Sequence, residues 1–193
     1  MSWHRLRAGR ELIIAGFILV VFFALDVYAV HHVFTSRYPG ANDFFSRWKG
    51  AQVFWKEGLD PYSDEATLAI QEGIYGRPAQ PDEDPGPFAY PFYTVFLLAP
   101  LAPLSYAWAQ AVWLVILQFS LVVGVLLCLK LVDLRLSRGL MLMTALWGVA
   151  FYHSARTILL GQFAGLVFLW VVGTLWALRK DRYVVAGVLL ALT

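Results

Sequence analysis

The chain has 193 residues, of which 60% are hydrophobic and only 15% are charged, and its formal net charge is +2. A soluble domain has roughly 45–50% apolar and about 25% charged residues, so this composition excludes an ordinary soluble protein. The small net charge gives no indication of nucleic-acid binding. The sequence therefore predicts an all-α integral membrane protein that crosses the bilayer several times.

Apolar runs account for most of the chain. They predict membrane-spanning helices at about 12–30, 105–129, 139–153 and 157–178, and the start of a further one at 183–193. A span needs about 20 mostly apolar residues, and one helix over 139–178 would be about twice that length. We therefore expect a break near the polar residues 153–157. The last run is too short for a span, so we expect the chain to be the front part of a longer protein.

A polar stretch, residues 31–87, separates the first two predicted spans and is expected to form a long outer loop. The stretch 90–104 that follows is apolar, but it contains Pro91, Pro100 and Pro103. Proline removes a backbone donor and breaks helices. This stretch is therefore predicted to be a re-entrant or interfacial segment and not a clean crossing.

Lysine and arginine residues predict the orientation of the chain. They occur before the first span and in two short loops: Arg5, Arg7 and Arg10; Lys130, Arg135 and Arg138; Arg179, Lys180 and Arg182. Two crossings separate each group from the next, so all three lie on one side of the membrane. Short loops rich in Lys and Arg stay in the cytoplasm. The N-terminus is therefore expected inside and the long loop outside.

The beginning of the long loop carries a helical pattern over residues 43–57. Its apolar positions recur every three or four residues, at Phe44, Trp48, Ala51 and Trp55. This pattern predicts an amphipathic helix that lies on the membrane surface. Asn42 or Asp43 can cap such a helix by accepting from free amides of its first turn. Alternatively, the Asp43 carboxylate acts as a general base on a hydroxyl at the membrane face.

Other polar features are given structural interpretations. The sequence Gly58–Tyr62 is typical of a turn. The acidic cluster 81–87 is expected to be a solvated turn, although acidic clusters can bind cations. Asp26 lies inside the first span, where it is either functional or hydrated and paired with Arg37 or a histidine. The adjacent histidines at 31–32 have no third ligand in view, which argues against a zinc site.

Three blocks of sequence, in chain order, resemble a known family. They are NDFFSRWKGAQVFWKEGLDPYS (42–63), FAYPFYTVFLLAPLAPLS (88–105) and the run from LLGQFAG to VVAGVLLALT (159–193). Together they resemble glycosyltransferase family 87, multi-pass enzymes of the GT-C superfamily that use polyprenyl-phosphate sugars. Trp48 stands where the family usually has tyrosine, and Phe92 where it commonly has a second proline.

The resemblance implies one GT-C-like transmembrane domain over residues 1–193, in a plasma membrane. It implies inverting transfer of a hexose or pentose, in the first place mannose, from a polyprenyl-phosphate donor to an extracytoplasmic glycolipid or glycan. The family's proposed catalytic base is an aspartate of the first outer loop, which corresponds to Asp43 here. Because the donor carries no nucleotide diphosphate, we expect no obligatory metal and no other cofactor.

Six residues are candidates for substrate binding: Arg47, Trp48, Tyr62, Tyr90, Arg156 and Gln162. Arginine binds phosphate through a planar fork. Arg156, in the predicted outward break, is the first candidate for the donor phosphate, and Arg47 is another. Each has the alternative of simply reaching towards the membrane interface. Gln162 either bonds a sugar hydroxyl or caps a helix.

Two other functions remain open at this point. A transporter or lipid flippase places polar residues along a path through the membrane. Here the predicted spans are nearly free of charge apart from Asp26, which favours an enzyme working at the membrane surface. An inactive, truncated fragment is the other alternative. In every case membrane lipids are expected partners, and oligomeric state is not predicted.

Overall fold

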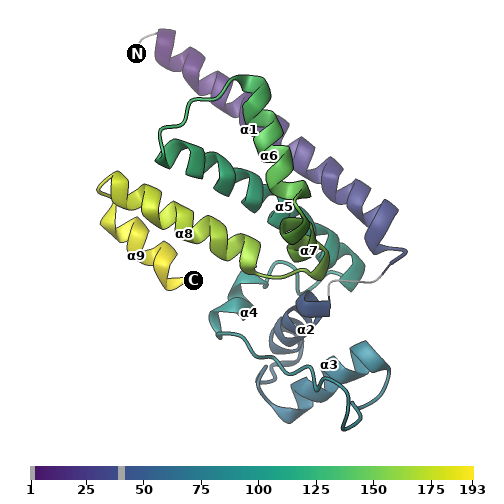
Figure 1. The fold of residues 1–193 in the computed structure, drawn as a ribbon. Coiled ribbons are helices and arrows are strands. Elements are labelled where there is room, and N and C mark those ends of the chain that lie inside the picture. The colour runs from purple at the N-terminus through teal and green to yellow at the C-terminus, as the bar shows by residue number, and fades with distance from the viewer. Residues whose placement is uncertain (1–2, 39–41) are drawn as a thin grey trace.

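The computed structural model describes residues 3–38 and 42–193, and the side chains of residues 9–38 and 43–193. All regular elements in these ranges are helices, which confirms the predicted all-α fold (Figure 1). The elements are α1 (Trp3–Val30), η1 (His31–Thr35), α2 (Asn42–Glu57), α3 (Asp64–Tyr75), α4 (Tyr93–Leu97), α5 (Tyr106–Leu131), α6 (Arg138–Ala150), α7 (Tyr152–Leu160), α8 (Ala164–Arg179) and α9 (Tyr183–Ala191). The side chains of Asn42, Arg5 and Arg7, which entered the predictions of capping and orientation, lie outside the described residues.

Two of the described helices are long and apolar enough to cross a membrane: Gly9–Thr35, formed by α1 and η1, and Tyr106–Leu131, which is α5. α7 and α8 make a third candidate if they are one span that bends by 117°. α6 is apolar but shorter. Most large apolar side chains of α1, such as Phe17 and Leu25, are exposed. Contiguous apolar surface of this kind suits contact with lipid, and the chain is a membrane protein.

The C-terminal end of α1 packs on the start of α5. In η1, the His31 ring stacks on Trp108 with ring centroids 3.6 Å apart, and the Thr35 hydroxyl donates to the carbonyl of Ala107 at 2.7 Å. Within the described side chains, Asp26 forms no ion pair with His31 or Arg37. The polar residues of this region therefore anchor η1 to α5 and do not neutralise Asp26.

The structure differs from the prediction over residues 139–178. The break expected near 153–157 lies two residues earlier, at Phe151 between α6 and α7, and residues 153–157 themselves are inside α7. The helical path ends at Phe151, whose ψ of 139° is extended, and at Gly161, whose φ of 67° is left-handed. Local polarity does not end a helix, whereas these backbone angles do.

Three of the four residues in the apolar stripe of α2 are buried inside the protein, while Trp55 is 46% exposed. Phe44 and Ala51 are fully buried and Trp48 is only 6% exposed, because α4 and α5 pack on this face of α2. The expectation of a position on the membrane surface was therefore wrong for Phe44, Trp48 and Ala51, although the helix itself is confirmed. Gly50 allows the close packing: a Cβ there would lie 2.3 Å from the ring of Phe88.

The proline-containing stretch 90–104 forms the short helix α4 and a series of turns along α2. Two tryptophans of α2 hold it in place. The indole of Trp48 donates to the carbonyl of Leu101 at 3.0 Å, and that of Trp55 donates to the carbonyl of Val95 at 2.7 Å. These bonds satisfy carbonyl groups in a region of the backbone where regular helix is interrupted.

The Asp-Pro-Tyr sequence forms a turn between α2 and α3, as predicted. The Asp60 carboxylate accepts from the backbone N–H of Tyr62 at 3.0 Å. Ser63 then caps α3, since its hydroxyl accepts from the N–H of Ala66 at 3.2 Å. The motif thus has a structural role that its local hydrogen bonds account for.

The acidic cluster 81–87 is held by its own contacts. Glu83 pairs with Arg77 at 2.7 Å and accepts from the backbone N–H of Gln80. Both interactions favour the carboxylate and lower the pKa of Glu83 to about 2. Among the described residues, no group of three or more His, Cys, Asp or Glu side chains is placed to hold a metal ion.

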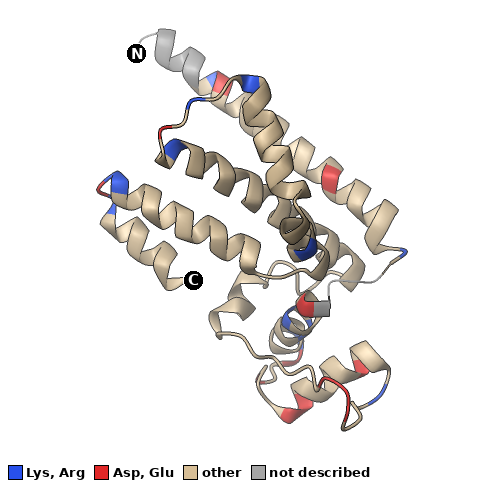
Figure 2. Cartoon of the chain, in the orientation of Figure 1, with Lys and Arg blue, Asp and Glu red and all other residues tan. Residues whose placement is uncertain are grey.

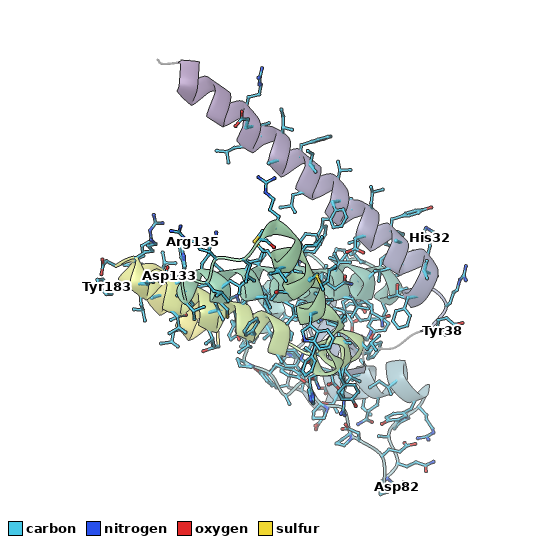
Figure 3. All side chains as sticks on the ribbon, turned by 45° about the horizontal axis from the view of Figure 1, so that its top comes forward. His32, Tyr38, Asp82, Asp133, Arg135 and Tyr183 are labelled. Atoms are coloured by element: carbon cyan, nitrogen blue, oxygen red, sulfur yellow. The ribbon has the colours of Figure 1, made fainter. Side chains whose placement is uncertain are left out.

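Charged residues are divided between two ends of the molecule. Lys and Arg gather at the loops that join α5 to α6 and α8 to α9, while many acidic residues lie around α3 (Figure 2). Figure 3 places Asp133, Arg135 and Tyr183 at one end and Asp82 at another. At the basic end, Arg179 pairs with Asp133 at 2.6 Å and donates to the carbonyl of Lys130 at 3.2 Å. These contacts join the two basic loops.

Candidate functional site

A hydrogen bond connects the beginning of α2 to the turn between α7 and α8. The side-chain amide of Gln162 donates from Nε2 to Oδ2 of Asp43 at 2.9 Å, although the two residues are 119 positions apart in the chain. Asp43 is partly buried in the first turn of α2. The contact holds one carboxylate oxygen. The other, Oδ1, accepts no hydrogen bond from the described residues and remains available to receive a proton.

The backbone around Gly161 directs Gln162 towards Asp43. Gly161 ends α7 in the left-handed conformation, with φ of 67°. Its carbonyl accepts from the indole N–H of Trp113 on α5 at 2.9 Å, and the N–H of Gln162 donates to the carbonyl of Thr157 at 3.0 Å. The turn is therefore tied to α5 and α7, and its geometry is suited to glycine.

We expect Gly161→Ala to lower the stability of the protein by about 1–2 kcal/mol, because a Cβ is unfavourable in the left-handed region. Thermal unfolding in detergent should then show a melting temperature lower by a few degrees. The matched control is Gly139→Ala, since Gly139 lies in α6 and a Cβ there has no neighbour within 4 Å. Equal melting temperatures for the two variants would contradict a strained turn at Gly161.

Aromatic rings form the base of the site. Phe44, next to Asp43, stacks on Trp113 with centroids 5.1 Å apart and planes at 7°. Trp113 also contacts Phe163, next to Gln162, at 4.6 Å. The two polar partners are thus each followed by a ring that packs on the same tryptophan. This shared packing fixes the relative position of α2 and the turn between α7 and α8.

Arg47 lies one helical turn after Asp43 and is only 6% exposed. Its Nη1 donates to the backbone carbonyl of Asp43. The guanidinium carbon is 3.8 Å from the ring centroid of Tyr90 and 5.1 Å from that of Phe163. Burial lowers the pKa of Arg47, while the neighbouring Tyr90 and Asp43 oppose that shift. The site thus combines a carboxylate and a buried cation on consecutive turns of one helix.

Tyr90 covers the guanidinium from the loop that precedes α4. Its side chain is partly buried, and this burial raises the pKa of its phenol. The hydroxyl of Tyr62 donates to the backbone carbonyl of Tyr90. The turn after α2 therefore holds the backbone of Tyr90, while the ring lies over Arg47.

The structure brings three of the six predicted substrate-binding residues to Asp43: Arg47, Tyr90 and Gln162. Trp48 and Tyr62 support the site through hydrogen bonds to backbone carbonyls. Arg156 is exposed on α7 and makes no hydrogen bond or ion pair with the described residues. Two site residues were missed, Trp113 and Phe163. Phe163 follows Gln162 directly, but nothing in the local sequence distinguishes Trp113 from the other apolar residues of its helix.

Comparison with known proteins identifies the second half of this site. The family model described as glycosyltransferase family 87 matches residues 88–193, just over half of the chain. The match includes Tyr90, Trp113 and Gln162, whereas Asp43 and Arg47 precede it. No curated protein and no solved structure matched the chain. The hydrogen bond between Gln162 and Asp43 therefore links the matched part of the chain to the helix that precedes it.

Proposed function

Since the chain belongs to glycosyltransferase family 87, we propose that this membrane glycosyltransferase moves a hexose or pentose from a polyprenyl-phosphate donor. In this proposal the acceptor is a glycolipid or glycan on the outer side of the cell membrane, and mannose is the first sugar to test. Asp43 acts as the general base. The proposal agrees with the resemblance of all three sequence blocks to the family.

The observation that carries the proposal is the contact between Asp43 and Gln162 at 2.9 Å. A general base needs a fixed position and a free oxygen that points to the hydroxyl it deprotonates. Gln162 holds Oδ2 of Asp43, and Oδ1 has no partner among the described side chains. A neutral amide donor orients the carboxylate without pairing it with a cation, whereas a tight ion pair with arginine would make it a weaker base.

The reaction needs one carboxylate. The acceptor hydroxyl oxygen attacks the anomeric carbon, its proton passes to Asp43, and the bond from that carbon to the phosphate oxygen breaks with its electron pair on the phosphate. A single displacement of this kind inverts the anomeric configuration, as in inverting glycosidases, where a base activates the nucleophile. The leaving group is already a phosphate, so no strong general acid is required.

The distribution of charge supports placing the site on the outer side. The basic loops around Arg135 and Arg179 gather away from α2 and α3 (Figure 2). Short basic loops stay in the cytoplasm, so the end of the protein that carries Asp43 is assigned to the outside. A polyprenyl-phosphate sugar can present its head group there while its chain remains in the bilayer.

Reconstituted protein provides the test. Proteoliposomes are supplied with radiolabelled polyprenyl-phosphate mannose, or the arabinose analogue, and with a lipid extract as acceptor. We expect labelled glycolipid or glycan to form and polyprenyl phosphate to be released. Donor that crosses the bilayer without chemical change would instead identify a flippase and overturn the proposed transfer.

A further inference from the structure

Arg47 has a feature that its structural contacts do not explain. It is buried, yet its Nε has no hydrogen-bond partner, and it forms no ion pair with a carboxylate of the described residues. Gln162 donates to one oxygen of the Asp43 carboxylate, and Arg47 donates to the backbone carbonyl of Asp43 and not to its carboxylate. A buried charge without a counter-ion is costly, and nearly all buried donors have partners. The guanidinium is therefore poised for an anion.

The aromatic rings around Arg47 limit where an anion can bind. The Tyr90 ring lies over one face of the guanidinium, with its centroid 3.8 Å from the guanidinium carbon. The Phe163 centroid is 5.1 Å from that carbon and 6.3 Å from the Tyr90 centroid, so Phe163 lies beside the guanidinium and not on its opposite face. A ring on one face of a guanidinium leaves its N–H groups for a ligand in the guanidinium plane. Nη1 already donates to the backbone carbonyl of Asp43, whereas Nε has no partner. The edge of the guanidinium that contains Nε can therefore donate to a new ligand.

We propose that the Nε edge of Arg47 binds the phosphate of the polyprenyl-phosphate donor and stabilises the charge that develops on it during transfer. This inference rests on the proposed function for the identity of the donor. The phosphodiester of the donor carries one negative charge, and the polyprenyl phosphate released carries up to two. Arg47 sits one turn from Asp43, so cation and base act on opposite sides of the same displacement.

Tyr90 controls access to this edge. Because Arg47 is only 6% exposed, a phosphate can reach Nε only if a covering side chain moves aside. The Tyr90 ring is partly exposed, whereas Phe163 packs on Trp113 inside the site. The hydroxyl of Tyr62 holds the backbone of Tyr90 but not its ring. The Tyr90 ring packs on Phe88 and Phe163, so it must leave these contacts before a phosphate can reach Nε.

Binding of undecaprenyl phosphate to purified protein in detergent tests the inference without transfer. We expect Arg47→Met to weaken this binding about tenfold to a hundredfold, the range typical for loss of a hydrogen bond to a charged group. Methionine retains an apolar stem that can pack against the Tyr90 ring, and apolar replacement of a buried charge is often tolerated. Undecaprenol, which lacks the phosphate, and phosphatidic acid, which presents a phosphate on another lipid, are the comparison ligands.

Arg135→Gln is the matched control, since Arg135 is an exposed arginine in the loop that joins α5 to α6, at the basic end of the molecule (Figure 3). We expect it to bind undecaprenyl phosphate as the wild type does. If Arg47→Met does not fold, as judged by thermal unfolding, Arg47→Lys replaces it, because lysine keeps the charge but lacks Nε. We expect severalfold weaker binding in that variant, and undiminished binding would contradict the role of Nε.

The possible outcomes separate the inference from the proposed function. Equal binding of undecaprenyl phosphate by wild type and Arg47→Met would overturn the phosphate site and leave the donor class intact. Arg47-dependent binding of phosphatidic acid without binding of undecaprenyl phosphate would support an anion site but overturn the donor. Binding of neither lipid by the wild type would overturn both.

Discussion

Asp43→Asn is expected to lower the rate of sugar transfer by about two to four orders of magnitude, the usual contribution of a general base. Asparagine has nearly the same shape, and its side-chain oxygen can still accept from Nε2 of Gln162. The geometry of the site should therefore persist, while the neutral amide cannot take the proton of the acceptor hydroxyl. The measurement is the initial rate of labelled product formation in proteoliposomes.

Asp82→Asn is the matched control for this experiment. Asp82 is an exposed acidic residue in the same long loop, and it lies at an outer tip of the molecule (Figure 3). The substitution makes the same chemical change without touching the site, so transfer should stay at the wild-type level. If Asp43→Asn kept full activity, or if both variants lost it, Asp43 would not be the base.

The local structure of the polar stretch between α1 and α5 could be predicted well. Spacing of apolar residues identified the helix of α2, and the Asp-Pro-Tyr turn forms through the local hydrogen bond between Asp60 and Tyr62. Such features depend on residues close together in the chain. The partner of the apolar face did not follow from its spacing, since periodicity shows which face is buried and not what covers it. Phe44 therefore packs on Trp113 of α5, where a bilayer surface was expected.

The arrangement of the site was beyond prediction for a similar reason. Gln162 was identified as a candidate, but its two expected roles were bonding a sugar and capping a helix. Its actual partner, Asp43, depends on the bend of 117° between α7 and α8, and hence on Gly161 and not on the polar stretch 153–157. No single-sequence pattern encodes such a long-range contact. Recognition of the family placed Asp43 and Gln162 as separate candidates, and the fold shows that they touch.

Gln162→Leu is expected to reduce the rate of transfer about tenfold to a hundredfold, which corresponds to the loss of one hydrogen bond to a charged group. Leucine is similar in size but cannot donate to Oδ2 of Asp43, so the carboxylate loses its orienting partner. If Gln162 acts through Asp43, the substitution mainly lowers kcat and changes the KM for the donor little. A sugar-binding role predicts the opposite, because lost contacts to substrate raise KM.

A double-mutant cycle distinguishes positioning of the base from general damage to the fold. In the Asp43→Asn background there is no base left to orient, so adding Gln162→Leu should lower the residual transfer little further. Residues that act as one unit show this lack of additivity, whereas independent effects multiply the losses in rate. Full multiplication of the two losses would show that Gln162 supports transfer by a route other than Asp43. If Gln162→Leu causes almost no further loss in the Asp43→Asn background, the 2.9 Å contact between Gln162 and Asp43 is part of the catalytic apparatus. The α2 helix would then be linked in function to the region that the family model matches.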